Sequence, residues 1–168
     1  MANTEADVRA AVVAGIKGIY ATLGFKTSPG NVHEYLLDKE RKGKLGDYLA
    51  TALDGVTPLR IRAWGVEVLA HEEYFAVREI PTRHYSITVQ GYYGAHGTNP
   101  VNTLIDHARH VRKAIYDLTS RISSTVDRTV AVTDVEIERL DNDEIPDEVY
   151  VGTFVYTAEK YNPGWTND

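Results

Sequence analysis

The sequence predicts a single α+β domain in which a four-stranded, mainly antiparallel sheet carries its helices on one face. Three observations lead to this fold class. A long amphipathic helical pattern covers residues 100–122, two β-patterned segments precede it, and two more follow it. Two strand pairs joined by a helix give the order β-β-α-β-β, and a second helical pattern near the N-terminus packs beside the first. We place the domain at residues 1–160 and an extended tail at residues 161–168.

The long helix has a defined beginning and one apolar stripe. Asn99 suits the N-cap, where its side chain can accept backbone N–H groups. Pro100 suits the first helical position, where a backbone N–H is not needed. The residues that recur at helical spacing predict the side that packs on the sheet: Val101, Leu104, Ile105, Ala108, Val111, Ile115, Leu118 and Ile122.

A second helix is predicted over residues 4–23. Apolar residues recur there at helical spacing, and Thr4 with Asp7 resembles a capping box. Gly24 stands where many helices end in a left-handed glycine. Residues 31–56 carry a weaker pattern, in which glycines frame a short helix near residues 45–52.

Alternating apolar residues predict four strands, over residues 59–70, 82–92, 130–137 and 149–157. The alternation changes phase within the first and third of these, which indicates a bulge or a bend. The last strand is apolar on both sides. Helices on one face cover only one of those sides, so we expect the other to meet another subunit. The aromatic residues of this strand that we assign to such a contact are Tyr150, Phe154 and Tyr156.

Composition limits the classes of function. The 168 residues include no cysteine, which excludes disulfides and thiolate metal sites. No stretch approaches the roughly 20 apolar residues that cross a bilayer, and the N-terminus lacks a signal-peptide pattern. We therefore expect a soluble protein that is made and folded in a cytoplasm. The formal net charge of −6 argues against a domain that binds nucleic acid by neutralising phosphates.

Acidic residues concentrate in residues 134–148, where Arg139 is the only basic residue. A solvated hairpin loop explains such a run. Asp141 and Asp143 have the spacing of a calcium loop, but the glycine and terminal glutamate of that loop do not follow. A third interpretation is a surface that repels DNA, formed by Glu136, Glu138, Asp141, Asp143 and Glu144.

No catalytic signature is present. The chain has no cysteine nucleophile and no Gly-x-Ser-x-Gly elbow, so we expect neither enzymatic activity nor a cofactor. His107 and His110 lie one helical turn apart and leave a small metal-dependent enzyme as an alternative, although zinc needs at least one more protein ligand. The glycine-rich residues 91–97 match no phosphate-binding motif and are expected to form a connecting loop.

The aromatic residues favour contacts with other proteins. Eleven tyrosines against three phenylalanines suit surfaces that are buried in an assembly yet remain partly wet. We expect the loop near residues 92–99 to present Tyr92, Tyr93 and His96 to a partner. Trp165, in the tail, is expected to dock on a neighbouring subunit, to pack on its own domain, or to fray with the tail.

Three segments resemble the tail terminator (tail completion) proteins of long-tailed bacteriophages. They are residues 60–66, residues 83–94 with the sequence RHYSITVQGYYG, and residues 149–157. The similarity covers most of the chain up to residue 160, and it lies in the order of the elements more than in individual residues.

This resemblance implies a virion structural protein without a cofactor. Its copies are expected to form a hexameric ring at the head-proximal end of the tail tube, where the ring ends tail assembly and joins the head. The implied partners are the tail tube protein and the head–tail connector proteins, while DNA passes through the lumen without specific binding. Residues 134–148 would then line the channel. A connector or adaptor protein of the neck and a non-viral monomeric adaptor domain are the alternatives.

Overall fold

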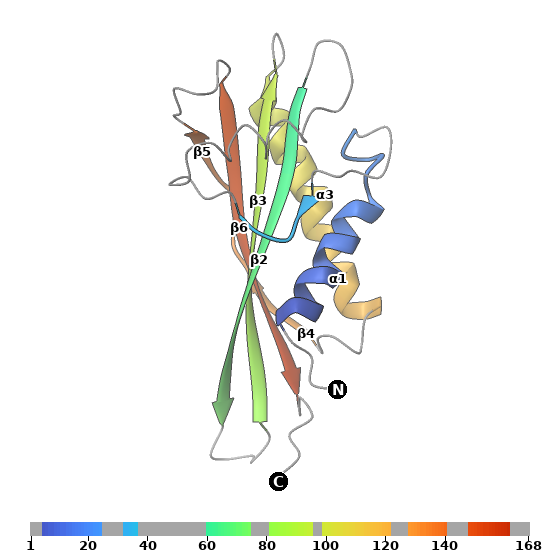
Figure 1. Cartoon of the computed structure of the whole chain (residues 1–168), viewed down its shortest axis with the longest axis vertical. Coiled ribbons are helices and arrows are strands. Elements are labelled where there is room, and N and C mark those ends of the chain that lie inside the picture. The colour runs from blue at the N-terminus through green and yellow to red at the C-terminus, as the bar shows by residue number, and fades with distance from the viewer. Residues whose placement is uncertain are drawn as a thin grey trace.

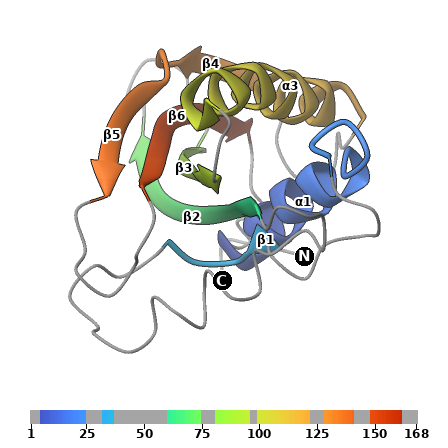
Figure 2. The ribbon, with the colours of Figure 1, turned by 90° about the horizontal axis from the view of Figure 1, so that it is seen from above.

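The chain folds into two helices and one mixed sheet in the computed structural model, which describes residues 5–24, 32–36, 60–74, 81–95, 99–121, 128–140 and 148–161. Both helices lie on one face of the sheet (Figure 1, Figure 2), so the predicted α+β class is confirmed. The helices are α1 (Glu5–Gly18) and α3 (Pro100–Arg121). The strands are β1 (Val32–His33), β2 (Arg60–Tyr74), β3 (Pro81–Ala95), β4 (Arg128–Val132), β5 (Glu136–Leu140) and β6 (Val149–Tyr161).

The described residues form a sheet of six strands, so the prediction of four was too low. The order is β1-β2-β3-β6-β4, and β5 also pairs with β6. β1 runs parallel to β2, and the other described pairings are antiparallel. The predicted third strand is in fact two, because residues 133–135 are not in strand conformation and β4 and β5 pair with different parts of β6. The short helix expected near residues 45–52 lies outside the described residues.

Three long strands form the centre of the sheet. β2 and β3 have 15 residues each and β6 has 13. Their lower ends extend past both helices in Figure 1. The pairing of β2 with β3 is continuous through Gly65, so the bulge predicted from the phase change in that strand is not present. A register shift does occur in β4, between Thr129 and Ala131.

The N-terminal helix is shorter than predicted, but the glycine after it behaves as expected. α1 ends at Gly18, and residues 19–24 continue as turns. Gly24 has a φ of 78°, in the left-handed region that favours glycine. Nη1 of Arg62 donates to the Leu23 carbonyl at 2.9 Å, and a Cβ on Gly24 would lie 2.0 Å from that nitrogen. The missing side chain therefore gives β2 room to cap this turn.

The long helix begins and packs as predicted. The Asn99 side-chain oxygen accepts the backbone N–H groups of Val101 at 3.1 Å and Asn102 at 3.4 Å, which makes Asn99 the N-cap. The apolar residues of α3 that are buried all belong to the predicted stripe: Leu104, Ala108, Val111 and Ile115.

The main core lies between the helices and the sheet. Alternate residues of a strand face opposite sides, so one set from each long strand meets the helices. Gly91 of β3 leaves space in this layer, because a Cβ there would lie 2.8 Å from the Trp64 ring and 2.9 Å from Leu104. The strand residues of the core are Val32 from β1, Trp64, Val66 and Val68 from β2, Tyr85, Ile87, Val89 and Tyr93 from β3, and Phe154, Tyr156 and Ala158 from β6.

The other face of the sheet is also buried near one end of β6. Val149 and Val151 are fully buried there, beside Leu140, Tyr92 and Ala63 of the neighbouring strands. The sequence predicts that the second apolar side of this strand meets another subunit. That expectation is corrected for Val149 and Val151, which are buried within the chain itself, whereas Val155 on the same side is only partly buried.

Candidate functional site

Tyr92 and Tyr93 lie in strand β3, so their predicted place in a connecting loop was wrong. The strand continues to Ala95 because its pairing with both neighbours runs through Gly91. Tyr93 is buried on the face toward the helices, and Tyr92 is buried on the opposite face. His96, the third residue of the predicted aromatic loop, lies outside the described residues.

Tyr93 joins the sheet to α3 through a buried network of hydrogen bonds, formed by Trp64, Tyr93 and His107. The Trp64 indole N–H donates to the Tyr93 hydroxyl at 3.2 Å. The same hydroxyl lies 2.8 Å from Nδ1 of His107. Since the hydroxyl accepts from the indole, its own proton is available to His107. In the tautomer of His107 that carries its hydrogen on Nε2, Nδ1 accepts this proton.

The surroundings keep this buried network uncharged. Burial is the main cause that lowers the pKa of His107 from 6.5 to about 4, and the nearby Arg62 cation adds to it. Burial also raises the pKa of the Tyr93 hydroxyl. Both groups are therefore neutral near neutral pH, and their visible role is to hold α3 against the sheet.

The two histidines of α3 do not share a ligand. His107 is 9% exposed and its Nδ1 is bonded to Tyr93. His110 is exposed and lies 3.9 Å from the Asp106 carboxylate, one turn earlier on the helix. Within the described ranges, no group of three or more histidines and carboxylates could hold a metal ion. Among the described residues, no third ligand accompanies these two histidines.

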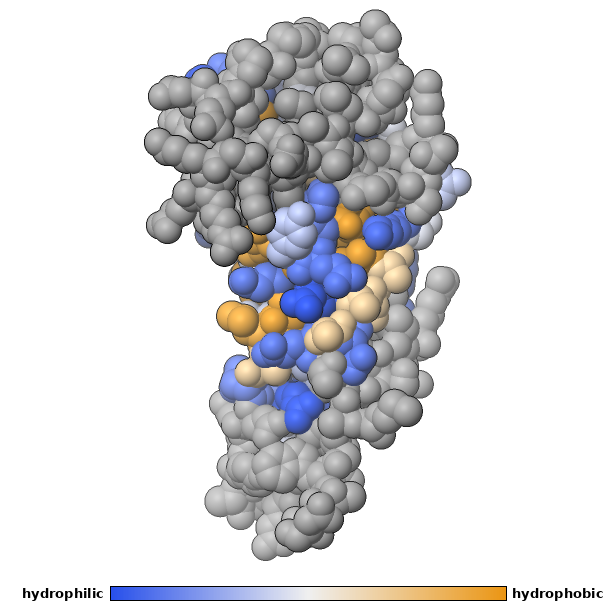
Figure 3. Space-filling model, viewed as in Figure 1, coloured by the Kyte–Doolittle hydropathy of each residue, from blue (hydrophilic) through white to orange (hydrophobic). Residues whose placement is uncertain are grey.

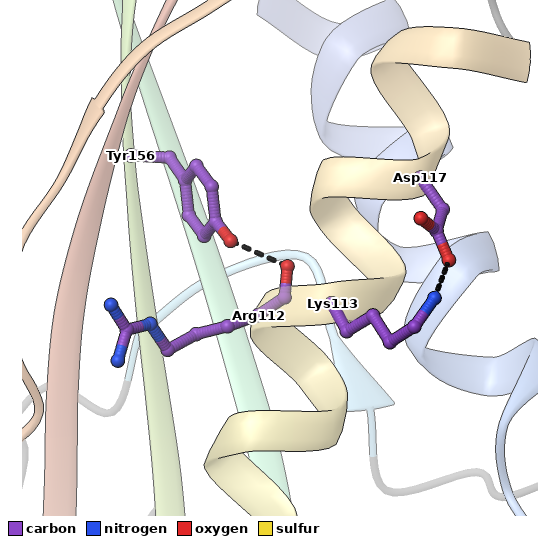
Figure 4. Close-up of polar contacts among 4 residues, drawn as sticks. All are labelled: Arg112, Lys113, Asp117 and Tyr156. Atoms are coloured by element: carbon purple, nitrogen blue, oxygen red, sulfur yellow. Dashed lines mark hydrogen bonds and ion pairs between the residues drawn. The ribbon is translucent and has the colours of Figure 1, made fainter.

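Phe154 and Tyr156 are core residues and not partner contacts, which corrects the prediction made for them. They face the helices because they are in register with Val89 and Ile87 of β3. The Tyr156 hydroxyl donates to the Arg112 carbonyl of α3 (Figure 4), and burial raises the pKa of Tyr156 to about 12. Both residues thus help to fix α3 on the sheet.

Tyr150 keeps part of its surface exposed. Its hydroxyl donates to the Glu148 carboxylate at 3.1 Å, and this bond is the main cause that raises the pKa of Tyr150. Of the described aromatic residues that were predicted to contact a partner, Tyr150 alone is not buried. Trp165 lies outside the described residues.

The outer side of α3 is polar. Figure 4 shows the Lys113 ammonium directed at the Asp117 carboxylate one turn later, and the two groups are 2.6 Å apart. Both side chains are exposed, and exposed pairs of this kind contribute at most about 1 kcal/mol. This helix face is therefore a solvated surface.

Two of the predicted channel-lining carboxylates are exposed on β5. Glu136 and Glu138 share the face of the sheet that is turned away from the helices, as the register with β6 shows. Arg139, on the same strand, pairs with Glu148 at 3.2 Å. The remaining carboxylates of that group lie outside the described residues: Asp141, Asp143 and Glu144.

Exposed large apolar side chains are few among the described residues. They are Tyr35, Leu69, Tyr116 and Val132. Among the coloured residues in Figure 3, hydrophobic and hydrophilic residues are interspersed. Leu69 and Val132 belong to β2 and β4, the strands on either side of the central pair β3 and β6.

No protein-family model matches the chain, and a search of curated proteins finds no match either. Neither of the two described helices combines the length and the apolar character that a membrane crossing requires. The arrangement of the elements and the surfaces described above are therefore the basis for a functional proposal.

Proposed function

We propose that this chain is a virion structural protein that forms a hexameric ring at the head-proximal end of a phage tail tube. The ring terminates tail assembly and provides the surface to which the head is joined. The order of the elements supports this proposal most: a helix, two long antiparallel strands, a long capped helix, and a return of the chain to the same sheet. The resemblance to tail terminator proteins rests on this order.

An open sheet with two unlike edges also supports a ring. A ring of identical subunits needs two different surfaces on each copy that fit each other. The described sheet ends with β1 and β2 on one side and with β4 and β5 on the other, and these two edges do not pair with each other. Each copy therefore has two distinct edges with which to meet two neighbours.

The proposed ring contacts other copies of itself, the tail tube protein and the head–tail connector proteins. DNA passes through the lumen without specific binding. The exposed carboxylates of Glu136 and Glu138 support this last point, because carboxylates repel the phosphates of DNA. The net charge of −6 has the same effect over the whole surface.

Negative-stain electron microscopy of the full chain, alone and mixed with purified tail tubes, tests the ring. We expect rings with a central hole at one end of the tubes, and a solution mass of several copies for any free rings. Monomers that leave both tube ends bare would refute the proposal and would favour a monomeric adaptor domain.

Charge reversal tests the position of the acidic strand. Glu136→Lys with Glu138→Lys should make the ring retain duplex DNA in a salt-sensitive manner, because the lumen becomes basic. Asp106→Lys with Asp117→Lys is the matched control, since it changes the net charge equally on the outer side of α3. Equal DNA retention by both double variants would show that β5 does not face the channel.

A further inference from the structure

We propose that one end of the sheet is a pH-sensitive switch, in which acid separates the end of β2 from β3 but leaves β3 paired with β6. The switch is a row of three ionisable side chains, His71, His84 and Glu159, which we call the histidine row. It goes beyond the proposed ring and does not depend on it. It follows from the contacts within the row, from its burial, and from the way in which β2 is held.

The histidine row crosses three strands on the face of the sheet that is turned away from the helices. His71 of β2 is in register with His84 of β3, and His84 is in register with Glu159 of β6. The two imidazole rings are stacked, with their centroids 5.1 Å apart and 12° between their planes. Nδ1 of His84 lies 3.5 Å from a carboxylate oxygen of Glu159. His84 therefore has a second imidazole on one side and a carboxylate on the other.

Burial makes the charges of this row matter. Glu159 is 7% exposed and His84 is 9% exposed, whereas His71 is exposed. A buried carboxylate needs a compensating neighbour, and the His84 ring supplies a positive charge when it is protonated. One carboxylate can balance only one of the two rings. When both rings are protonated, the row has a net positive charge and two like charges lie side by side.

Other ionisable residues occupy neighbouring positions of this face. By register they are Glu73 of β2, Tyr161 of β6 and Arg128 of β4. Glu73 and Arg128 are of opposite charge, so together they leave the net charge of the row unchanged. Histidine is the side chain that ordinarily changes its charge between about pH 5 and 8. Acidification over that range therefore acts on the row through its two rings.

β2 is the strand that repulsion between the rings can move. β1 pairs with only two residues of β2, both before Ala70, so the described pairing beyond Ala70 is with β3 alone. The Ala70 N–H donates to the Glu5 carboxylate of α1 at 2.7 Å, and past this anchor the strand extends beyond both helices (Figure 1). β3 is also paired with β6 at this level, where Glu159 attracts a protonated His84. The repulsion therefore acts on the end of β2.

The hydrogen bonds of the strands provide amides that report on each side of β3 separately. Opposite residues of an antiparallel pair alternate between bonded and non-bonded pairs. Because Ala70 directs its N–H out of the sheet, the next pair, His71 with His84, is bonded between β2 and β3. Tyr85, the following residue of β3, is then bonded to Ala158 of β6. Loss of β2 frees the first two amides and leaves the other two protected.

Hydrogen exchange of the full chain, resolved at single amides, tests the switch at about pH 7.5 and about pH 5. Protection factors are compared, because they correct for the pH dependence of exchange itself. Repulsion between unit charges 5.1 Å apart shifts an equilibrium about 4-fold in bulk water and more at a lower dielectric constant. We therefore expect the protection of the His71 and His84 amides to fall about tenfold relative to Tyr85 and Ala158.

Two variants separate the histidine row from a general effect of acid. His71→Gln removes one of the two ring charges and should abolish the relative fall in protection. His71 is exposed, so this variant should keep the fold. His110→Gln is the matched control, because His110 is an exposed histidine of α3 on the opposite face of the sheet. This control should keep the fall seen in the wild type.

Three results overturn the inference. One is a wild type in which the His71 and His84 amides show no relative loss of protection at the lower pH. Another is the same loss in His71→Gln, and the third is an equal loss at Tyr85 and Ala158, which would mean that the sheet opens on both sides of β3. Electron microscopy measures ring formation separately, so a failure of the proposed function leaves this test unaffected.

Discussion

Acidification is predicted to destabilise the fold through His107 in the buried network. In the folded protein its Nδ1 accepts the Tyr93 hydroxyl proton, and burial lowers its pKa to about 4. In the unfolded chain the same ring has its ordinary pKa of about 6.5. Between these values the unfolded state binds a proton and the folded state does not. This contribution to stability is therefore fully present above pH 6.5 and is lost as the pH falls toward 4.

The size of the effect follows from the pKa shift. A difference of about 2.5 units between 6.5 and 4 corresponds to about 3 kcal/mol, at about 1.4 kcal/mol per unit. The residue is 9% exposed, so water reaches part of it and screens the charge of the ring. We therefore expect a loss of about 2 kcal/mol, which is a large share of the roughly 5–15 kcal/mol that stabilises a typical domain.

Urea unfolding at a series of pH values measures this loss. His107→Asn is the matched variant, because its amide oxygen takes the place of Nδ1 and can accept the Tyr93 proton without titrating. The carboxylates and the other histidines titrate in both proteins and cancel in the comparison. Between pH 6.5 and 4, the wild type should lose about 2 kcal/mol more than His107→Asn. His110→Asn, on the exposed side of the same helix, should keep the pH dependence of the wild type.

Two results would contradict this reasoning. One is an identical pH dependence for the wild type and His107→Asn. The other is an NMR titration of the folded protein that gives His107 a pKa near 6.5. A buried ring bonded to Tyr93 should keep its pKa well below that value. Either result would mean that the bond from Tyr93 to His107 does not persist in solution.

Three further predictions concern packing, and urea unfolding at neutral pH tests them all. Gly24→Ala should destabilise by at least about 1–2 kcal/mol, because alanine is strained at its positive φ and the new Cβ would overlap Arg62. Gly18→Ala, with nothing within 4 Å, should be neutral or stabilise by up to about 1 kcal/mol, so equal effects at these two glycines would contradict the prediction. Gly91→Ala should cost about 1–3 kcal/mol by overpacking the core, and an unchanged urea midpoint would show that the core can make room. Tyr156→Phe should cost about 1 kcal/mol through its lost bond to α3, and full stability would mean that this bond contributes nothing.

The long helix could be predicted from the sequence because its signals are local. Asn99 and Pro100 mark its start, and the apolar stripe recurs within one element, so no knowledge of distant contacts was needed. The cap and the burial of Leu104 and Val111 agree with that prediction. The alternating apolar residues that predicted β2 and β3 are an equally local signal. The glycines near residues 91–97 led to a predicted end of β3 that was too early.

Features that depend on distant contacts could not be predicted. β1 has two residues, too few for any periodic pattern. Tyr92 and Tyr93 were assigned to a loop because glycines flank them, yet Gly91 makes room for the Trp64 ring from another strand. Likewise, no spacing in the sequence signals that Tyr93 would meet His107 across the sheet–helix interface.

The burial of the last strand was misjudged for a related reason. An apolar pattern on both sides of β6 shows that both sides are covered, but it does not show by what. The structure covers Phe154 and Tyr156 with the helices and buries Val149 and Val151 on the opposite face. The hydrophobic pattern therefore predicted correctly that these residues are buried, but it led to the wrong prediction that another subunit buries them.

The position of β6 within the sheet has a consequence for the synthesis of the chain. β6 is the last described strand, yet it lies between β3 and β4 and also holds β5. On the ribosome, β3, β4 and β5 emerge before the strand that joins them has been made. The sheet can form completely only after residues 149–161 have left the ribosome. The pairing of β6 with β3 joins segments far apart in the sequence, and such pairing is slow. Translation that stops before residue 149 thus yields a chain with exposed strand edges, which is a target for proteases and not a smaller working subunit.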